Sequence, residues 1–156
     1  MEPATLAART TLLRRPRSDE WDRILEILET ANFHRIGGPE MPDFPLGNCF
    51  VAEKDGLVVG VAGYRILDRT TAKTTLLAVH PDHRCGGDIG TRLQRARMDF
   101  LKGQGIRLLR TNVDDPRVLR WYQRRFGYES TGQTVPKVEP FGRPEIQFWT
   151  TLEVAL

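Results

Sequence analysis

The chain has 156 residues, of which 40% are hydrophobic and 28% charged, and a formal net charge of +3. This length predicts one domain over residues 1–156, with residues 1–9 as a flexible tail. Ordinary apolar content at low net charge excludes a disordered chain, and no apolar run approaches the roughly 20 residues of a membrane span. We therefore expect a cytoplasmic protein with no membrane partner.

Cysteines, histidines and basic residues are scattered along the chain. Two cysteines and three histidines show no metal-ligand spacing and no disulfide framework, so we expect no metal. Only four of the 23 basic residues are lysines, and acidic residues are interleaved among the arginines. Nucleic-acid binders concentrate basic residues on one face, so we expect no nucleic-acid partner and keep a basic nucleic-acid binder as a third hypothesis. A phosphorylated cofactor fits this charge at least as well.

The N-terminal third predicts a strand, a helix and a loop. Residues Thr10–Arg14 indicate a short strand that Pro16 ends. Ser18 can cap the following helix, whose apolar face is spaced as in an amphipathic helix. A stretch rich in glycine and proline, residues 35–48, predicts a loop with one helical turn at most. The apolar residues of the helix are Trp21, Ile24, Leu25 and Leu28.

The middle of the chain predicts an antiparallel meander. Three β-type runs, Cys49–Glu53, Leu57–Leu67 and Thr71–His80, are separated by short polar turns. Pro81 stops the third run, and a glycine cluster follows. The helix after the glycines is expected to bury one apolar face. Its members are Ile89, Leu93, Ala96 and Phe100.

The C-terminal third predicts a strand, a helix and two final strands. The strands are Ile106–Thr111, Tyr128–Val135 and Ile146–Val154, and the helix opens at Asp115-Pro116 and closes at Gly127. The whole chain is thus α/β (α+β), with a mixed central sheet of six to seven strands, helices on both faces, and the order β-α-(α)-β-β-β-α-β-α-β-β.

The glycine cluster after the meander is the segment that points to chemistry. Glycines at a helix start leave backbone N–H groups aimed at one point, which makes an anion site. Arg84 and Arg92 add positive charge there. The segment is no Walker loop, since no Gly-Lys-Ser/Thr follows, and no Rossmann loop, since its strand ends a meander. A plain glycine-rich turn is the structural alternative.

Two segments resemble the GNAT superfamily of N-acetyltransferases. LAVHP at residues 77–81 with Arg84-x-x-Gly87 is similar to the family's acetyl-CoA signature, and DPRVLRWYQRRFGY at residues 115–128 to its next block. The order of elements agrees over residues 10–154. Two features depart from the pattern: the second glycine comes one residue late, behind the carboxylate of Asp88, and the spacing from Tyr122 to the next glycine is one residue longer.

The resemblance implies an acetyl-CoA-dependent N-acetyltransferase acting on a primary amine of a small molecule or peptide by direct attack. It implies that the pantetheine arm lies between the third meander strand and the next parallel strand, where an N–H near Val79 polarises the thioester carbonyl. Tyr122 is implied as the acid for the departing thiolate, with a core aromatic as the alternative. The implied cofactor residues are Leu77, Ala78, Val79, Arg84, Cys85, Gly86, Gly87, Asp88, Ile89, Gly90, Thr91, Asn112, Asp115 and Tyr122.

Three alternatives stay open at this point. Asp115 stands where the family more often has Asn, so either Asn112 substitutes or Asp115 only caps its helix. The strand on which many members carry a glutamate has Lys73 and no carboxylate, so no base is named. Candidates for the base are Asp114, Glu40, Glu145, His80 and a water relay. A CoA-binding module without turnover is the alternative function.

Acceptor selection is assigned to two loops, residues 33–44 and 136–145. Arg65 and Arg110 lie in predicted strands, where side chains alternate between the two faces. They either point into the pocket, which would favour a carboxylate or phosphate on the substrate, or lie on the surface. A homodimer is left open as the assembly.

Overall fold

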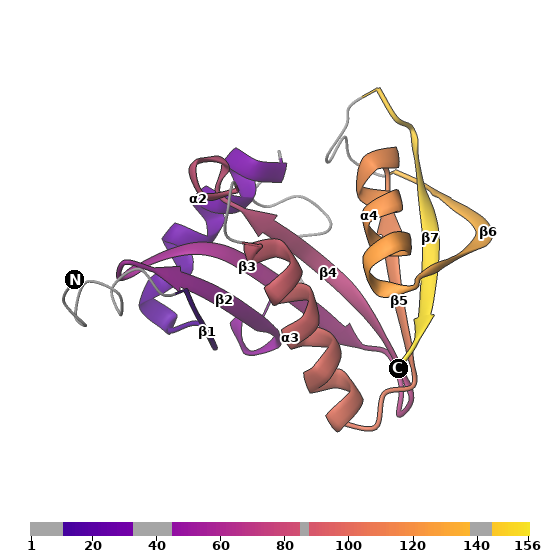
Figure 1. The fold of residues 1–156 in the computed structure, drawn as a ribbon, viewed down its shortest axis with the longest axis horizontal. Coiled ribbons are helices and arrows are strands. Elements are labelled where there is room, and N and C mark those ends of the chain that lie inside the picture. Colours follow the sequence, from indigo (N-terminus) through magenta and orange to yellow (C-terminus); the bar gives the residue numbers. More distant parts are fainter. Residues whose placement is uncertain (1–10, 33–44, 85–87, 138–144) are drawn as a thin grey trace.

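The computed structural model describes residues 11–32, 45–84, 88–137 and 145–156. Within them the strands form one seven-stranded sheet in the order β1-β2-β3-β4-β5-β7-β6, and β4 and β5 are its only parallel neighbours (Figure 1). The predicted α/β class with a mixed sheet is confirmed. The elements in chain order are β1 (Leu12–Arg14), the helical turn η1 (Ser18–Glu20), α2 (Trp21–Asn32), η2 (Leu46–Asn48), β2 (Cys49–Lys54), β3 (Leu57–Ile66), β4 (Thr71–Val79), η3 (Pro81–His83), α3 (Ile89–Gly103), β5 (Leu108–Val113), α4 (Pro116–Phe126), β6 (Glu129–Pro136) and β7 (Phe148–Ala155).

The predicted strands differ from the observed ones by up to two residues at their ends, and two of the local differences have a physical reason. Ser18 lies inside η1 and does not cap α2; the N-cap is Arg17, whose backbone N–H donates to the Glu20 carboxylate at 2.7 Å. A carboxylate three residues into a helix can reach back in this way, as in a capping box. Strand β5 begins at Leu108 rather than at Ile106, because the N–H of Ile106 still bonds to the end of α3.

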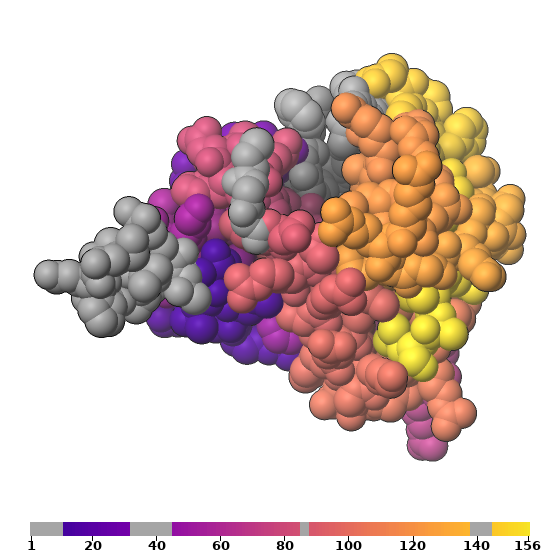
Figure 2. Space-filling view, in the orientation of Figure 1, coloured from indigo at the N-terminus to yellow at the C-terminus, as the bar shows by residue number. Residues whose placement is uncertain are grey.

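Helices cover both faces of the sheet. Apolar residues of α2 pack on one face of β2, β3 and β4, while Ile89 and Leu93 of α3 pack on the alternating residues of the same strands, which face the other way. Helix α4 shares a core with the end of α3, so these two helices lie on the same face (Figure 2). The α2 residues that pack on the sheet are Ile24, Ile27 and Leu28.

No helix within the described ranges is long and apolar enough to cross a membrane.

A β-bulge interrupts β4 in its middle. Gly63 lies opposite Leu76 and Tyr64 lies opposite Thr74, so Thr75 is an extra residue on β4. A side chain at position 63 would overlap the Thr75 hydroxyl, which explains the glycine there. The bulge reverses the alternation of β4: Ala72 packs with the α4 core, whereas Leu76 packs with the α2 core.

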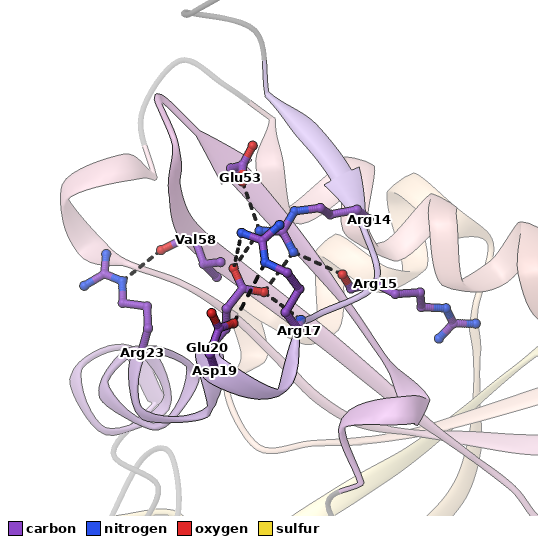
Figure 3. A network of polar contacts seen from close by, with 8 residues as sticks. All are labelled: Arg14, Arg15, Arg17, Asp19, Glu20, Arg23, Glu53 and Val58. Carbon is purple, nitrogen blue, oxygen red and sulfur yellow. Dashed lines mark hydrogen bonds and ion pairs between the residues drawn. The ribbon is translucent and has the colours of Figure 1, made fainter.

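An ion cluster fixes the N-terminal strand and turn to β2 (Figure 3). Arg14 donates to Glu20 at 2.6 and 2.8 Å and to Glu53 at 2.9 Å, and these side chains are largely buried. Hydrogen bonding to Arg14 holds the pKa of Glu20 at about 2, and hydrogen bonding to Glu20 raises the pKa of Arg14. One guanidinium thereby joins β1, η1 and β2.

Glu20→Gln should lower the free energy of unfolding by roughly 1–3 kcal/mol at pH 7, because it removes charge-assisted bonds to a largely buried Arg14. Since the pKa of Glu20 is lowered to about 2 from 4.5, its stabilisation is complete above about pH 4.5 and lost as the pH falls toward 2. Urea denaturation over this range should show a smaller loss in the variant. Glu29→Gln, at an exposed position of α2, is the control; equal acid slopes for E20Q and the parent would contradict the prediction.

Candidate active site

The site is built around a fork between β4 and β5. The two strands pair only over Thr71–Lys73 and Leu108–Arg110, and beyond this their last contact is a hydrogen bond of 2.6 Å between the hydroxyls of Thr74 and Thr111. Strand β5 then continues along β7, while β4 diverges from it, as Figure 1 shows. Among the described strands, none therefore pairs with the second half of β4 on the side that faces β5.

Backbone N–H groups of β4 point toward this side of the strand. The N–H of His80 donates to the carbonyl of Val59 in β3 at 2.8 Å. Because successive peptide groups of a strand point to opposite edges, the N–H groups of Val79 and Leu77 face β5 and that of Ala78 faces β3. Of the three residues predicted to line the slot, two present their N–H to the fork, and Ala78 does not.

The start of α3 lies beyond the C-terminal end of β4. The first bond that closes a helical turn runs from the N–H of Arg92 to the carbonyl of Asp88 at 2.9 Å, so the amides of Ile89, Gly90 and Thr91 precede the helical ladder. Asp88 adopts a left-handed conformation with φ 50° and makes no side-chain cap. Its exposed carboxylate lies 3.9 Å from a guanidinium nitrogen of Arg125 in α4, which offsets the negative charge that departs from the family pattern.

The rest of the predicted glycine loop is only partly described. Cys85, Gly86 and Gly87 lie outside the described residues. Arg84 donates to the carbonyl of Val79 at 3.1 Å and to that of Ala31 at 3.1 Å. Its guanidinium thus joins the end of β4 to the end of α2.

A buried guanidinium connects the two sides of the fork. Arg97 of α3 is fully buried and donates five hydrogen bonds: two to Gln94, one each to the carbonyls of Gly63 and Leu76 at 2.8 Å, and one to the hydroxyl of Tyr122 at 3.1 Å. The carbonyls belong to the bulge of β3 and β4, and Tyr122 belongs to α4. Every N–H of the guanidinium has an acceptor, as a buried charge requires.

Tyr122 is a core residue with a polar contact. Only 4% of it is exposed, and its ring packs against Trp121 and Tyr128. The hydroxyl of Tyr128 in turn accepts from Gln94 at 2.9 Å, and burial raises the pKa of Tyr128. Because Arg97 can only donate, the hydroxyl oxygen of Tyr122 acts as acceptor and its hydrogen is directed to another group.

The remaining predicted site residues each contact a different partner. Asp115 accepts the backbone N–H of Arg117 at 2.8 Å, so its side chain caps α4. A helix cap is one of the two alternatives that the sequence left open for this residue. Asn112 accepts from the hydroxyl of Thr151 at 2.8 Å. Among the candidate bases, Asp114 accepts from Lys137 at 2.6 Å in a largely buried ion pair.

The contacts of the other candidate bases and possible metal ligands do not single out any of them for a role in the site. His80 accepts the backbone N–H of Asp82 at 3.2 Å, and Glu40 lies outside the described residues, as does nearly all of both acceptor loops. Cys49 is buried, and burial raises its pKa to about 12. Among the described residues, no group of three or more His, Cys, Asp or Glu side chains could hold a metal ion.

A hollow of about 300 Å³ adjoins the fork. Arg110 and Asn112 belong to the face of β5 opposite to Leu109, which packs in the α4 core. The hollow is therefore reached from the face that α4 does not cover. It is lined by Leu67, Lys73, Thr74, Arg110, Thr111, Asn112, Gln133, Val135 and Thr151.

Comparison with known proteins decides the family. The sequence model described as "Acetyltransferase (GNAT) family" matches residues 13–128, most of the chain. The chain belongs to the GNAT family of acetyltransferases. The resemblance inferred from the sequence and the predicted enzyme class, an acyltransferase, are thereby confirmed. A search of curated protein sequences finds no match.

Solved structures share the GNAT fold at low sequence identity. Ard1 from Thermoplasma volcanium superposes with a TM-score of 0.76 at 18% identity, over 94% of this chain and 97% of that one. YncA from Salmonella typhimurium, a putative acetyltransferase solved with acetyl-CoA, gives 0.71 at 18%, over 94% of each chain. N-acetylglutamate synthase from Neisseria gonorrhoeae, complexed with coenzyme A and N-acetyl-glutamate, gives 0.70 at 21% over 94% of this chain, which spans only 35% of that enzyme.

Sequence reasoning missed the polar core of this GNAT domain. Ile89 and Leu93 of the predicted apolar face of α3 are buried, but Ala96 and Phe100 are only partly buried. The other buried positions of the helix are Gln94, Arg97 and Leu101. The available signal was spacing: Arg97 lies four residues from Leu93 and four from Leu101. A cation in that position of an apolar stripe indicates a buried charge.

Arg97→Lys should lower the free energy of unfolding by roughly 1–3 kcal/mol, because lysine keeps the charge but offers three donors to acceptors arranged for five. Arg120→Lys is the matched control, at an exposed position of α4, and should change it by less than about 0.5 kcal/mol. Chemical denaturation of both variants measures the difference. An R97K protein as stable as R120K would show that the carbonyls of the bulge do not depend on the five donors of this guanidinium.

Proposed function

We propose that the chain binds acetyl-CoA along the fork and transfers its acetyl group to a primary amine of a small molecule or peptide. The observation that carries this proposal is the early end of β4–β5 pairing, beyond which the N–H group of Val79 faces the fork and not β3. An extended ligand with amide groups binds such an N–H as an added strand would. Coenzymes bound to two of the similar folds support the assignment.

The start of α3 suits the diphosphate of the coenzyme. Amides that precede a helical ladder, at the positive end of the helix, bind phosphate oxygens. Ile89, Gly90 and Thr91 supply such amides, and the segment from Arg84 through Asp88 leads into them. Arg125 adds a cation that the sequence did not single out, and it lies close to Asp88.

The chemistry requires an electrophile, an oxyanion donor and a proton. The bound thioester offers its carbonyl carbon to the amine nitrogen; the C–N bond forms as the C–S bond breaks. We assign the Val79 N–H to the carbonyl oxygen, where one preorganised donor is typically worth about 2.7–4 kcal/mol. The attacking amine is neutral and loses one proton to solvent, while the departing thiolate gains one.

Tyr122 is assigned as the donor of that proton. Its hydroxyl oxygen accepts from Arg97 at 3.1 Å, so the hydroxyl hydrogen does not point toward Arg97 and can be donated to another group. The phenolate regains a proton from solvent or from the attacking amine after each turnover.

The cytoplasmic location, the single domain and the homodimer remain predictions.

Tyr122→Phe should lower the turnover number roughly hundredfold, the scale of one general acid, with coenzyme A affinity unchanged. Tyr128→Phe is the matched control, because it removes a second hydroxyl from the same buried network. Single-turnover acetylation with labelled acetyl-CoA and calorimetry measure the two quantities. Equal turnover in the two variants would return Tyr122 to a purely structural role, and coenzyme binding with no transfer to any amine would identify a binding module.

Gly87→Glu should abolish coenzyme A binding, because it adds bulk and negative charge where the sequence places the phosphate loop. Gly103→Glu, at a glycine with open space around it, should bind coenzyme A as the parent does. Titration calorimetry with coenzyme A compares the three proteins. Full affinity in G87E would contradict the loop assignment.

A further inference from the structure

Three cations lie side by side across the centre of the sheet. Arg65 of β3 is directly opposite Lys73 of β4, and Lys73 is directly opposite Arg110 of β5. Directly paired residues project from the same face of a sheet. Like charges in this arrangement destabilise a sheet, so the row costs free energy unless anions offset it.

Within the described ranges, Arg110 and Lys73 differ in whether a carboxylate offsets their charge. Arg110 pairs with Glu153 of β7, with 2.8 Å between Nε and Oε1. Lys73 has no ion pair with any carboxylate in the described ranges, although its side chain is partly buried. A partly buried ammonium without a counterion is a binding determinant for an anion.

Lys73 and Arg110 both line the hollow beside the fork. The rest of the lining contains no carboxylate and several neutral groups that can donate hydrogen bonds. The hollow is thus cationic, with donors around the cations, which is the composition that binds a carboxylate or a phosphate. The neutral side chains of the lining that keep a hydrogen to donate are Thr111, Asn112 and Gln133, since the hydroxyls of Thr74 and Thr151 already donate to Thr111 and Asn112.

The position of the hollow links it to acetyl transfer. Thr74 and Thr111 line it, and their hydroxyls also make the last contact between β4 and β5 before the fork opens. Its volume of about 300 Å³ equals that of roughly ten water molecules at about 30 Å³ each. A small molecule, or one end residue of a peptide, fills that space.

We propose that this hollow holds an anionic group of the acceptor, so that the substrate is a small amine carrying a carboxylate or phosphate, with Lys73 as its main charged contact. This inference rests on the acetyl transfer proposed above. It also excludes polyamines and other cationic acceptors, because a second ammonium group would meet the ammonium of Lys73 and the guanidinium of Arg110. Cationic walls repel such substrates while they attract anionic ones.

The test compares amines that differ only in charge. Glycine is paired with glycinamide, phosphoethanolamine with ethanolamine, and 4-aminobutyrate with 1,4-diaminobutane, each at saturating acetyl-CoA. The anionic member of at least one pair should show a kcat/KM about tenfold or more above its partner, as one charge-assisted hydrogen bond provides. The carboxylate and phosphate pairs identify which anion is preferred.

Lys73→Gln should remove that preference, and Lys73→Glu should reverse it toward 1,4-diaminobutane. Lys102→Gln, at an exposed position of α3, should leave the preference intact. Equal or faster acetylation of the uncharged and cationic members by the parent protein would overturn the inference while acetyl transfer itself stood.

A binding measurement keeps the inference testable if no amine is acetylated. N-acetylglycine and N-acetylglycinamide are titrated by NMR into the protein saturated with coenzyme A. The anionic compound should bind about tenfold more tightly, and K73Q should remove the difference. Equal affinity would overturn the anionic site, whereas failure of the protein to bind coenzyme A in calorimetry would overturn the proposed function instead.

Discussion

The guanidinium of Arg97 joins the elements on both sides of the fork. It holds the carbonyls of Gly63 and Leu76 in the bulge and the hydroxyl of Tyr122 on α4. Burying such a charge is costly unless every donor finds an acceptor, and here five bonds satisfy it. One buried polar network therefore joins α3 to the bulge of β3 and β4 and to α4.

The bulge explains why β4 and β5 do not simply pair along their whole lengths. After Thr75 the side chains of β4 have exchanged faces, so that Leu76 lies in the α2 core. Neighbouring β5 keeps its alternation, with Leu109 and Val113 in the α4 core. The extra residue also increases local twist and ends regular pairing. One inserted residue, accommodated by Gly63, thus ends the pairing of two parallel strands.

Local signals in the sequence predicted the helices, strands and turns of this fold. The features that depend on contacts between residues distant in sequence were not predicted. The meander followed from short turns, and the opening of α4 from Asp115-Pro116, because caps and turns depend on neighbouring residues alone. The capping of η1 by Glu20 was missed, since Ser18 offered an equally good local cap. Arg97 was missed because periodicity assigns a cation to the surface, and only its acceptors on β3, β4 and α4 make its burial favourable.

The two sides of the fork bind by different physics. Main-chain amides of β4 and α3 present fixed partial charges that suit the proposed coenzyme, and they depend on backbone geometry rather than on side-chain identity. The hollow on the other face depends on side chains, and a single change at Lys73 alters its charge. In the proposed reaction, the neutral amine nitrogen of the acceptor reaches the thioester between these two regions. The anionic group of the acceptor is held at Lys73, so it does not compete with the coenzyme for the backbone N–H groups. The division lets acceptor choice change through side chains on β4 and β5 while the bulge, the fork and Arg97 stay the same.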